Sequence, residues 1–148
     1  MKMKIRMKKI SILTLLSLFN FGCDYGLTLV NCPESQNKPS ERAALIVSQE
    51  WPHIVDSVNT MNIVCKERDQ MQFDVDAYTV RLVAFGSSPR GLMVVDNKIP
   101  VGNAICHEAA HWSLMVEGED PCSSHSTDCG WDQLVVDRLT NVIQAEFE

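Results

Sequence analysis

The stretch from Ile105 to Trp112, ICHEAAHW, limits the possible folds of this chain more than any other. Its apolar residues recur at helical spacing and favour an α-helix with one continuous apolar stripe. That stripe consists of Ile105, Ala109, Trp112 and Val116. On such a helix His107 and His111 lie one turn apart and project together, away from the stripe. The fold must therefore cover one face of this helix and leave the other accessible.

The rest of the chain supplies candidate partners for that helix. Asn103 is a favourable N-cap, so we expect the helix from Ala104 to about Val116, stopped by Gly118. A further helical pattern follows Ser40, strand patterns cover 62–70 and 77–85, and 91–102 resembles a hairpin turning at 96–98. Residues 131–147 predict a C-terminal helix. This order predicts an α+β fold, with a small, mostly antiparallel sheet packed against the helix at 104–116.

The first residues resemble an export signal. Five of the 13 Lys and Arg residues precede an apolar run that ends at Phe21. Gly22-Cys23 then resembles the lipobox of bacterial lipoproteins, in which the cysteine is lipidated; the alternative is an ordinary cleaved signal with Cys23 as a structural thiol. We expect a lipoprotein signal peptide at 1–22, a polar tether at 23–40 and a domain at 41–148. The protein is then expected on the periplasmic or cell-surface side of a bacterial envelope, held to the membrane by its lipid.

Charge and cysteine content narrow the possible partners. Without residues 1–22, 8 Lys and Arg residues remain against 19 Asp and Glu residues, a formal charge of −11. This balance argues against binding to nucleic acid, which needs a basic surface. In an exported chain the six cysteines favour disulfides. We predict that Cys122 pairs with Cys129 and that Cys32 pairs with Cys65.

His107-Glu108-x-x-His111 has the spacing of a zinc site. Two imidazoles one helical turn apart can bind one Zn²⁺. Glu108 lies about 100° round the helix from His107, beside the metal, where its carboxylate can act as a general base on a zinc-activated water. The motif therefore predicts two metal ligands and a catalytic base.

A catalytic zinc usually has a third protein ligand. We favour His125, because the chain between it and His111 can bend at Gly118 and Pro121 and because Cys122 and Cys129 bracket it. His53 is expected to be a surface or capping histidine. Carboxylates remain alternatives for the third ligand: Glu117, Glu119, Asp120, Asp128, Asp132 and Asp137.

These residues resemble the zincin metallopeptidases, whose motif is HExxH. The order of catalytic helix, glycine turn and third histidine is similar to the metzincin branch, although the gap to His125 is longer here and looks more like small zincin-like lipoproteins of bacteria. The resemblance implies a zinc peptidase acting on a peptide or protein substrate. We expect the strand at Gly91–Val95 to be an open sheet edge that can pair with an extended peptide.

Two other functions remain open. A non-catalytic lipoprotein could be stabilised by zinc and bind a partner protein, in which case the site would be closed by a fourth protein ligand. A disulfide-held binding domain would hold no metal. The presence of Glu108 favours catalysis, because a structural zinc site needs no base.

Overall fold

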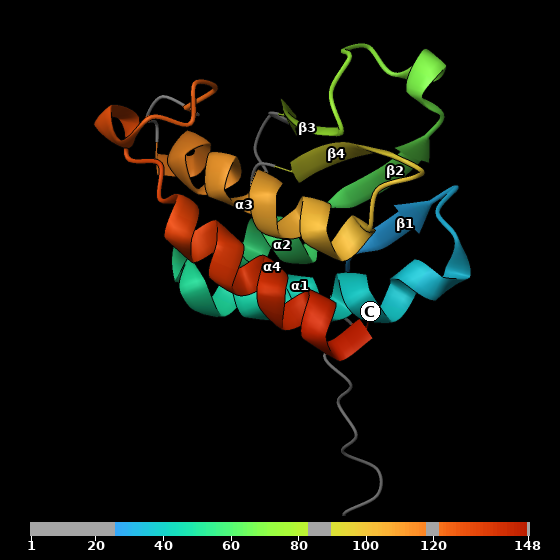
Figure 1. Ribbon diagram of the computed structural model, residues 1–148, viewed down its shortest axis with the longest axis horizontal. Helices are drawn as coiled ribbons and strands as arrows, with labels where there is room; N and C mark the ends of the chain where they lie inside the picture. Colours follow the sequence, from blue (N-terminus) through green and yellow to red (C-terminus); the bar gives the residue numbers. More distant parts are fainter. Residues whose placement is uncertain (1–25, 83–89, 118–121, 148) are drawn as a thin grey trace, which may run out of the picture.

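The computed structural model describes residues 26–82, 90–117 and 122–147 (Figure 1). The expected signal peptide at 1–22 and the expected lipid-bearing Cys23 lie outside these residues. The helices described are α1 (Asn37–Glu50), α2 (Val55–Asn59), α3 (Val101–Glu117) and α4 (Gln133–Phe147). The strands are β1 (Thr28–Val30), β2 (Asn62–Lys66), β3 (Ala77–Leu82) and β4 (Arg90–Asp96).

The four strands form one mixed sheet in the order β1-β2-β4-β3. β1 pairs with β2 and β2 pairs with β4 in parallel, and only β3 and β4 are antiparallel. The α+β class is confirmed, but the expectation of a mostly antiparallel sheet is wrong. Parallel neighbours need a long crossover connection, and here α1 and α2 supply it between β1 and β2.

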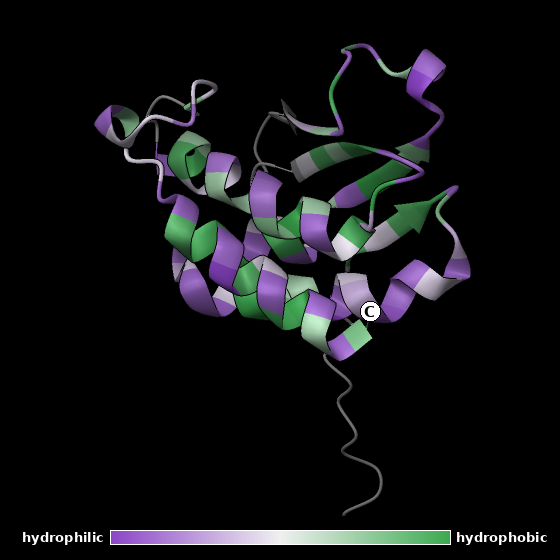
Figure 2. Cartoon of the chain, viewed as in Figure 1, coloured by the Kyte–Doolittle hydropathy of each residue, from purple (hydrophilic) through white to green (hydrophobic). Residues whose placement is uncertain are grey.

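Helix α3 lies in the middle of the molecule, between the sheet and the pair formed by α1 and α4 (Figure 1). Two large side chains of its apolar stripe, Ile105 and Trp112, are buried. Along α4, hydrophilic and hydrophobic residues alternate (Figure 2), as expected for a helix with one face in water. The buried face of α4 carries Val136, Leu139 and Ile143. The helix with the two histidines is thus held on both sides.

The expected hairpin at 91–102 is not formed. β4 ends at Asp96, whose side chain accepts a hydrogen bond from the Lys98 N–H at 3.0 Å, and α3 begins at Val101. Pro100 stands just before the helix, where its missing N–H costs nothing. The expectation of an open sheet edge at Gly91–Val95 is therefore wrong, because this strand is an inner one with a neighbour on each side. Among the described strands the two edges are β1 and β3. Of the two edge strands, β3 lies against α3.

The expected tether at 23–40 is also wrong over its described part. Residues 28–30 form β1, and α1 begins at Asn37, three residues before the predicted cap at Ser40. The predicted disulfide between Cys32 and Cys65 is confirmed, and it joins the segment after β1 to β2, with which β1 pairs. The folded unit therefore begins well before residue 41.

Candidate metal centre

Helix α3 presents His107 and His111 on its accessible side. Both side chains are partly exposed, whereas Ile105, Ala109 and Trp112 on the other side are buried. The ring of Trp112 lies directly against Gly91 of β4, where a Cβ would come within 1.5 Å of it. This close approach seats α3 on the sheet and so sets the direction in which the two histidines point.

His125 reaches the same place from a loop. The predicted disulfide between Cys122 and Cys129 is confirmed and closes a ring around it. Within the ring the His125 N–H donates to the Cys122 carbonyl at 2.8 Å, and both residues have left-handed backbone conformations, with φ of 53° and 61°. Such conformations are uncommon for residues other than glycine and need support from their surroundings. The disulfide and the tight turn supply that support.

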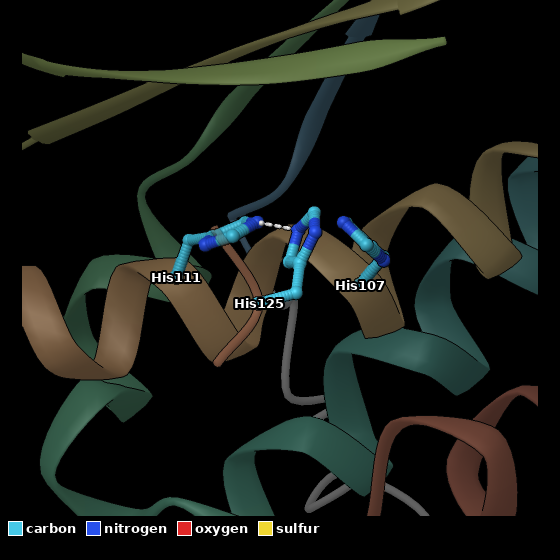
Figure 3. Close-up of side chains that lie close together, drawn as sticks. All are labelled: His107, His111 and His125. Carbon is cyan, nitrogen blue, oxygen red and sulfur yellow. Dashed lines mark hydrogen bonds between the residues drawn. The ribbon is translucent and has the colours of Figure 1, made fainter. Parts of the chain in front are cut away.

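The three histidines form one cluster (Figure 3). One ring nitrogen from each of His107, His111 and His125 lies within 4.8 Å of the other two. The Nε2 atoms of His111 and His125 are 3.0 Å apart. Within the described parts of the chain, this is the one group of three or more histidine, cysteine or acidic side chains with the geometry to hold a metal ion.

Burial and neighbouring rings lower the pKa of two of these imidazoles. Burial is the largest cause for His107, whose pKa is lowered to about 4, and His111 and His125 contribute to the same shift. The pKa of His125 is lowered too, first by burial and then by His111. Neutral imidazole is the form that binds metal ions. Near neutral pH, His107 and His125 therefore need lose no proton to act as ligands.

Glu108 lies beside the cluster and is buried. Its Oε2 accepts a hydrogen bond of 2.9 Å from the Thr79 hydroxyl on β3. Burial raises the pKa of Glu108, and the hydrogen bond from Thr79 opposes that rise. A carboxylate in this setting is a stronger base than one in water, and its orientation is fixed by the neighbouring strand.

The cluster opens into a cleft of about 870 Å³ between α3, α4 and the chain leading into β3. All three histidines and Glu108 line it. Phe73 and Val75 line it as well, although 51% and 41% of their surfaces are exposed. Exposed apolar side chains beside polar groups are typical of a binding site.

An ionic contact holds the wall of the cleft that carries Phe73 and Val75. The Arg68 guanidinium lies 2.8 Å from the buried carboxylate of Asp96 at the end of β4, and it also contacts Asp76, which lines the cleft. The Asp96 N–H donates to the Asp76 carbonyl at 2.8 Å. Residues 68–76 are in this way fixed to the sheet.

Three of the carboxylates that are alternatives for the third ligand make other contacts. Glu117 lies 3.5 Å from the Nε2 of His53, Asp132 accepts a hydrogen bond from the Val135 N–H at the start of α4, and Asp137 accepts one from Gln133. Asp128 is exposed in the His125 loop. Glu119 and Asp120 lie outside the described residues. His53 also lies 3.3 Å from the Ser113 carbonyl, away from the cluster, as expected.

Two residues of the site were not predicted from the sequence. Thr79 donates a hydrogen bond to Glu108, which lies 29 positions further along the sequence. The ring of Trp131 lies against all three histidine rings. The first contact depends on β3 being the edge strand. A signal for the second was present, since Trp131 closely follows His125 and Cys129 in the predicted ligand loop.

Comparison of the chain with models of protein families, with curated proteins and with solved structures finds no match. Within 26–82, 90–117 and 122–147, no helix has the length and hydropathy needed to cross a membrane.

Proposed function

We propose that this protein is an exported, zinc-dependent hydrolase of the zincin type that cleaves peptide bonds. The observation that carries the proposal is the meeting of three imidazoles and a buried carboxylate at one cleft. His107, His111 and His125 are the proposed ligands, and Glu108 is the proposed general base. His125 takes preference over the described carboxylates because none of them belongs to the cluster.

The chemistry of the cluster fits zinc. Neutral imidazole is a preferred zinc ligand, and catalytic zinc sites commonly have three protein ligands. Two nitrogens bound to one tetrahedral zinc ion at about 2.0–2.1 Å lie about 3.4 Å apart. The Nε2 atoms of His111 and His125 are 3.0 Å apart and all three ligand nitrogens lie within 4.8 Å of one another, so zinc binding would draw the rings together by about an ångström. A structural zinc would have a fourth protein ligand, and the described cluster holds three residues.

Bound zinc would lower the pKa of a water molecule and polarise the substrate carbonyl. The Glu108 carboxylate would accept the proton of the attacking water. Oε2 is occupied by the hydrogen bond from Thr79, so Oε1 is the atom assigned to this step. Glu108 would then return the proton to the amine that leaves when the C–N bond breaks. The burial that raises the pKa of Glu108 strengthens it as a base, and the hydrogen bond from Thr79 opposes that rise and aligns the carboxylate.

A peptide is the substrate best suited to the cleft. An edge strand has unpaired backbone N–H and C=O groups, and β3 could pair through these with an extended chain. Phe73 and Val75 would contact apolar side chains of that chain. Two disulfides are typical of an oxidising compartment, which supports export. A lipid on Cys23 remains part of the proposal, because the leader and Gly22-Cys23 motivate it.

The variant Glu108→Gln tests the proposal. Glutamine has nearly the size of glutamate but cannot accept the proton, so turnover of a peptide library should fall by about 10²–10⁴-fold. Zinc content, measured on the same samples by elemental analysis, should stay at one ion per chain. Glu117→Gln, on the same helix but outside the cluster, is the matched control and should leave both quantities unchanged.

Three results would contradict the proposal in different ways. Unchanged turnover in Glu108→Gln would assign the base to another residue. Wild-type protein that binds zinc but cleaves no peptide would favour the alternative, a zinc-stabilised lipoprotein that binds a partner. Wild-type protein that takes up no zinc, even when zinc is added, would leave a disulfide-held binding domain as the function.

A further inference from the structure

Trp131 lies beneath the three histidines. Its ring centroid is 5.1 Å from that of His107, 4.5 Å from that of His111 and 4.4 Å from that of His125. The three imidazole centroids are themselves 4.9–5.1 Å apart. The four rings therefore form a roughly tetrahedral group, in which the indole closes one side of the triangle formed by the imidazoles.

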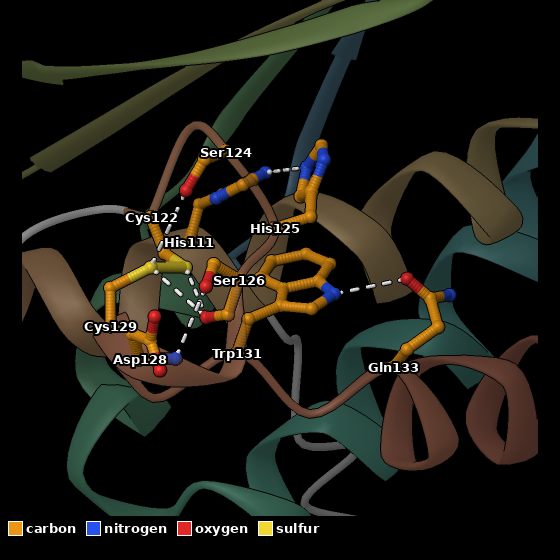
Figure 4. Close-up of a disulfide and its surroundings, with 9 residues drawn as sticks. All are labelled: His111, Cys122, Ser124, His125, Ser126, Asp128, Cys129, Trp131 and Gln133. Carbon is orange, nitrogen blue, oxygen red and sulfur yellow. Dashed lines mark hydrogen bonds between the residues drawn. A yellow bond between two sulfur atoms is a disulfide. The ribbon is translucent and has the colours of Figure 1, made fainter.

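The indole is held from several directions. It is 3% exposed and packs in a small core cluster with Ala110, Cys122 and Val136. Its Nε1–H donates to the Gln133 side chain at 3.0 Å (Figure 4), and its backbone N–H donates to the Ser126 carbonyl at 3.3 Å. A side chain fixed in this way can in turn fix the rings that lie against it.

The position of Trp131 separates two cavities. The cleft is lined by the histidines, whereas Trp131 lines a smaller cavity of about 210 Å³ together with Trp51 and residues of α3 and α4. Trp131 thus stands between the histidine cluster and this second cavity. Water or substrate would reach the centre of the cluster from the cleft side.

We propose that Trp131 is a positioning residue of the metal centre. Its indole is an aromatic floor that orients all three imidazoles and closes the side of the cluster that faces away from the cleft. The proposal rests on the proposed function, since it takes the three histidines as metal ligands. Groups that orient metal ligands commonly change metal affinity or activity by about 10- to 100-fold when they are altered. Trp131 does so through ring packing, and it joins the His125 loop to α4 through Gln133.

The first measurement is zinc affinity, by competition with a chromophoric chelator. Trp131→Leu removes the aromatic face and keeps an apolar side chain, so affinity should fall by about 10- to 100-fold. Trp131→Phe keeps an aromatic face without the Nε1–H and should stay closer to wild type. Trp51→Leu is the matched control, because Trp51 packs on the same small cluster and lines the second cavity but not the cleft. It should retain wild-type affinity.

The second measurement needs no turnover. Cobalt added in place of zinc should give a visible absorption spectrum that changes in Trp131→Leu, because the coordination geometry is no longer fixed, and that is retained in Trp51→Leu. In the metal-free protein, the ring-proton NMR signals of the three histidines should be displaced by the indole ring current. That displacement should disappear in Trp131→Leu.

These results separate the two proposals. Folded Trp131→Leu with wild-type zinc affinity and a wild-type cobalt spectrum would overturn the role of Trp131 and leave the zinc site intact. Wild-type protein that binds neither metal would contradict the proposed function. The NMR comparison would then still test whether Trp131 packs against the three imidazoles. Histidine signals that do not change in Trp131→Leu would overturn that role. Circular dichroism and the Tm of each variant show whether it is folded.

Discussion

His125 differs from the other two histidines in the way the chain holds it. His107 and His111 are placed by the hydrogen bonds of α3, a helix that is buried on its other face. His125 is exposed, lies outside any helix or strand, and has a left-handed backbone conformation. Its position depends on the Cys122–Cys129 ring and on packing against Trp131. The proposed third ligand is thus the one most easily displaced.

We therefore expect His125→Ala to lose zinc affinity while Asp128→Ala keeps it. Asp128 is an exposed residue of the same loop and is the matched control. Removing one of three ligands weakens binding, and the remaining pair on α3 cannot compensate, because their spacing is fixed by the helix. Chelator competition on both variants measures the ranking. The reverse ranking would make a carboxylate the third ligand.

At the scale of residues, the sequence predicted those parts of the site that depend on local spacing. His107, Glu108 and His111 share one helix, so their relative placement follows from helical geometry. His125 was favoured because of its bracketing cysteines, and the structure brings it to the other two. Thr79 escaped prediction, because its contact with Glu108 depends on which strand lies at the edge.

Among the elements, the seating of α3 on β4 should be sensitive to one added methyl group. In Gly91→Ala the new Cβ would overlap the ring of Trp112, which is almost completely buried, so the helix or the ring must shift. Overpacking of this kind usually costs about 1–3 kcal/mol. Urea unfolding should show a lower midpoint with the same slope. An unchanged midpoint would mean that α3 can move away from the sheet without loss.

The contact between Arg68 and Asp96 leads to a prediction about acid stability. The hydrogen bond from the Lys98 N–H and the charge of Arg68 lower the pKa of Asp96, against the raising effect of its burial. A carboxyl group whose pKa is lower in the folded state stabilises the fold above its unfolded pKa of about 3.9. That contribution is lost as the pH falls through the folded pKa.

Asp96→Asn should therefore be less stable than wild type at pH 7, and its stability should fall less steeply below about pH 4. Asp74→Asn is the matched control. Asp74 also faces Arg68, at 3.6 Å, but its side chain is 97% exposed, and surface pairs of this kind contribute little. Thermal unfolding of the three proteins between pH 2 and pH 7 provides the comparison. Parallel curves for wild type and Asp96→Asn would contradict the argument.

The elements themselves were easier to predict than their order in the sheet. The helices α3 and α4 and the strands β2 and β3 correspond to expected segments, because hydrophobic periodicity is a local property. The prediction of a hairpin at 91–102 was wrong, because the chain turns at Asp96 and enters α3 at Val101. β1 is only three residues long and is followed by a polar segment. No local sequence pattern indicated this strand or its pairing with β2.

Across the whole molecule, the two disulfides should serve different purposes. Cys32–Cys65 spans 33 positions and Cys122–Cys129 spans 7. Loop entropy predicts a stabilisation of about 4 kcal/mol for the first and about 2.5 kcal/mol for the second. Replacing the first pair with serines should lower the free energy of unfolding more. Replacing the second pair should weaken zinc binding more, because only that ring contains His125.

Each double variant is the control for the other. Denaturant unfolding gives the stability of both proteins, and chelator competition gives their zinc affinity. The expected result is a crossed pattern, in which the less destabilised protein is the poorer zinc binder. If the loss of zinc affinity in each double variant simply followed its loss of stability, the disulfide ring around His125 would have no special role at the metal centre.

The contact of Trp112 with Gly91 has a consequence for how such a chain can evolve. Because the indole fills the space that a side chain at position 91 would need, the effect of a substitution at one of the two positions depends on the residue at the other. A descendant that gained a side chain at 91 would lose stability unless 112 had already become smaller. Position 112 directly follows His111, which is a proposed ligand. Substitutions at position 91, on an inner strand of the sheet, therefore depend on the residue next to that ligand. In an alignment of relatives, these two columns should change together.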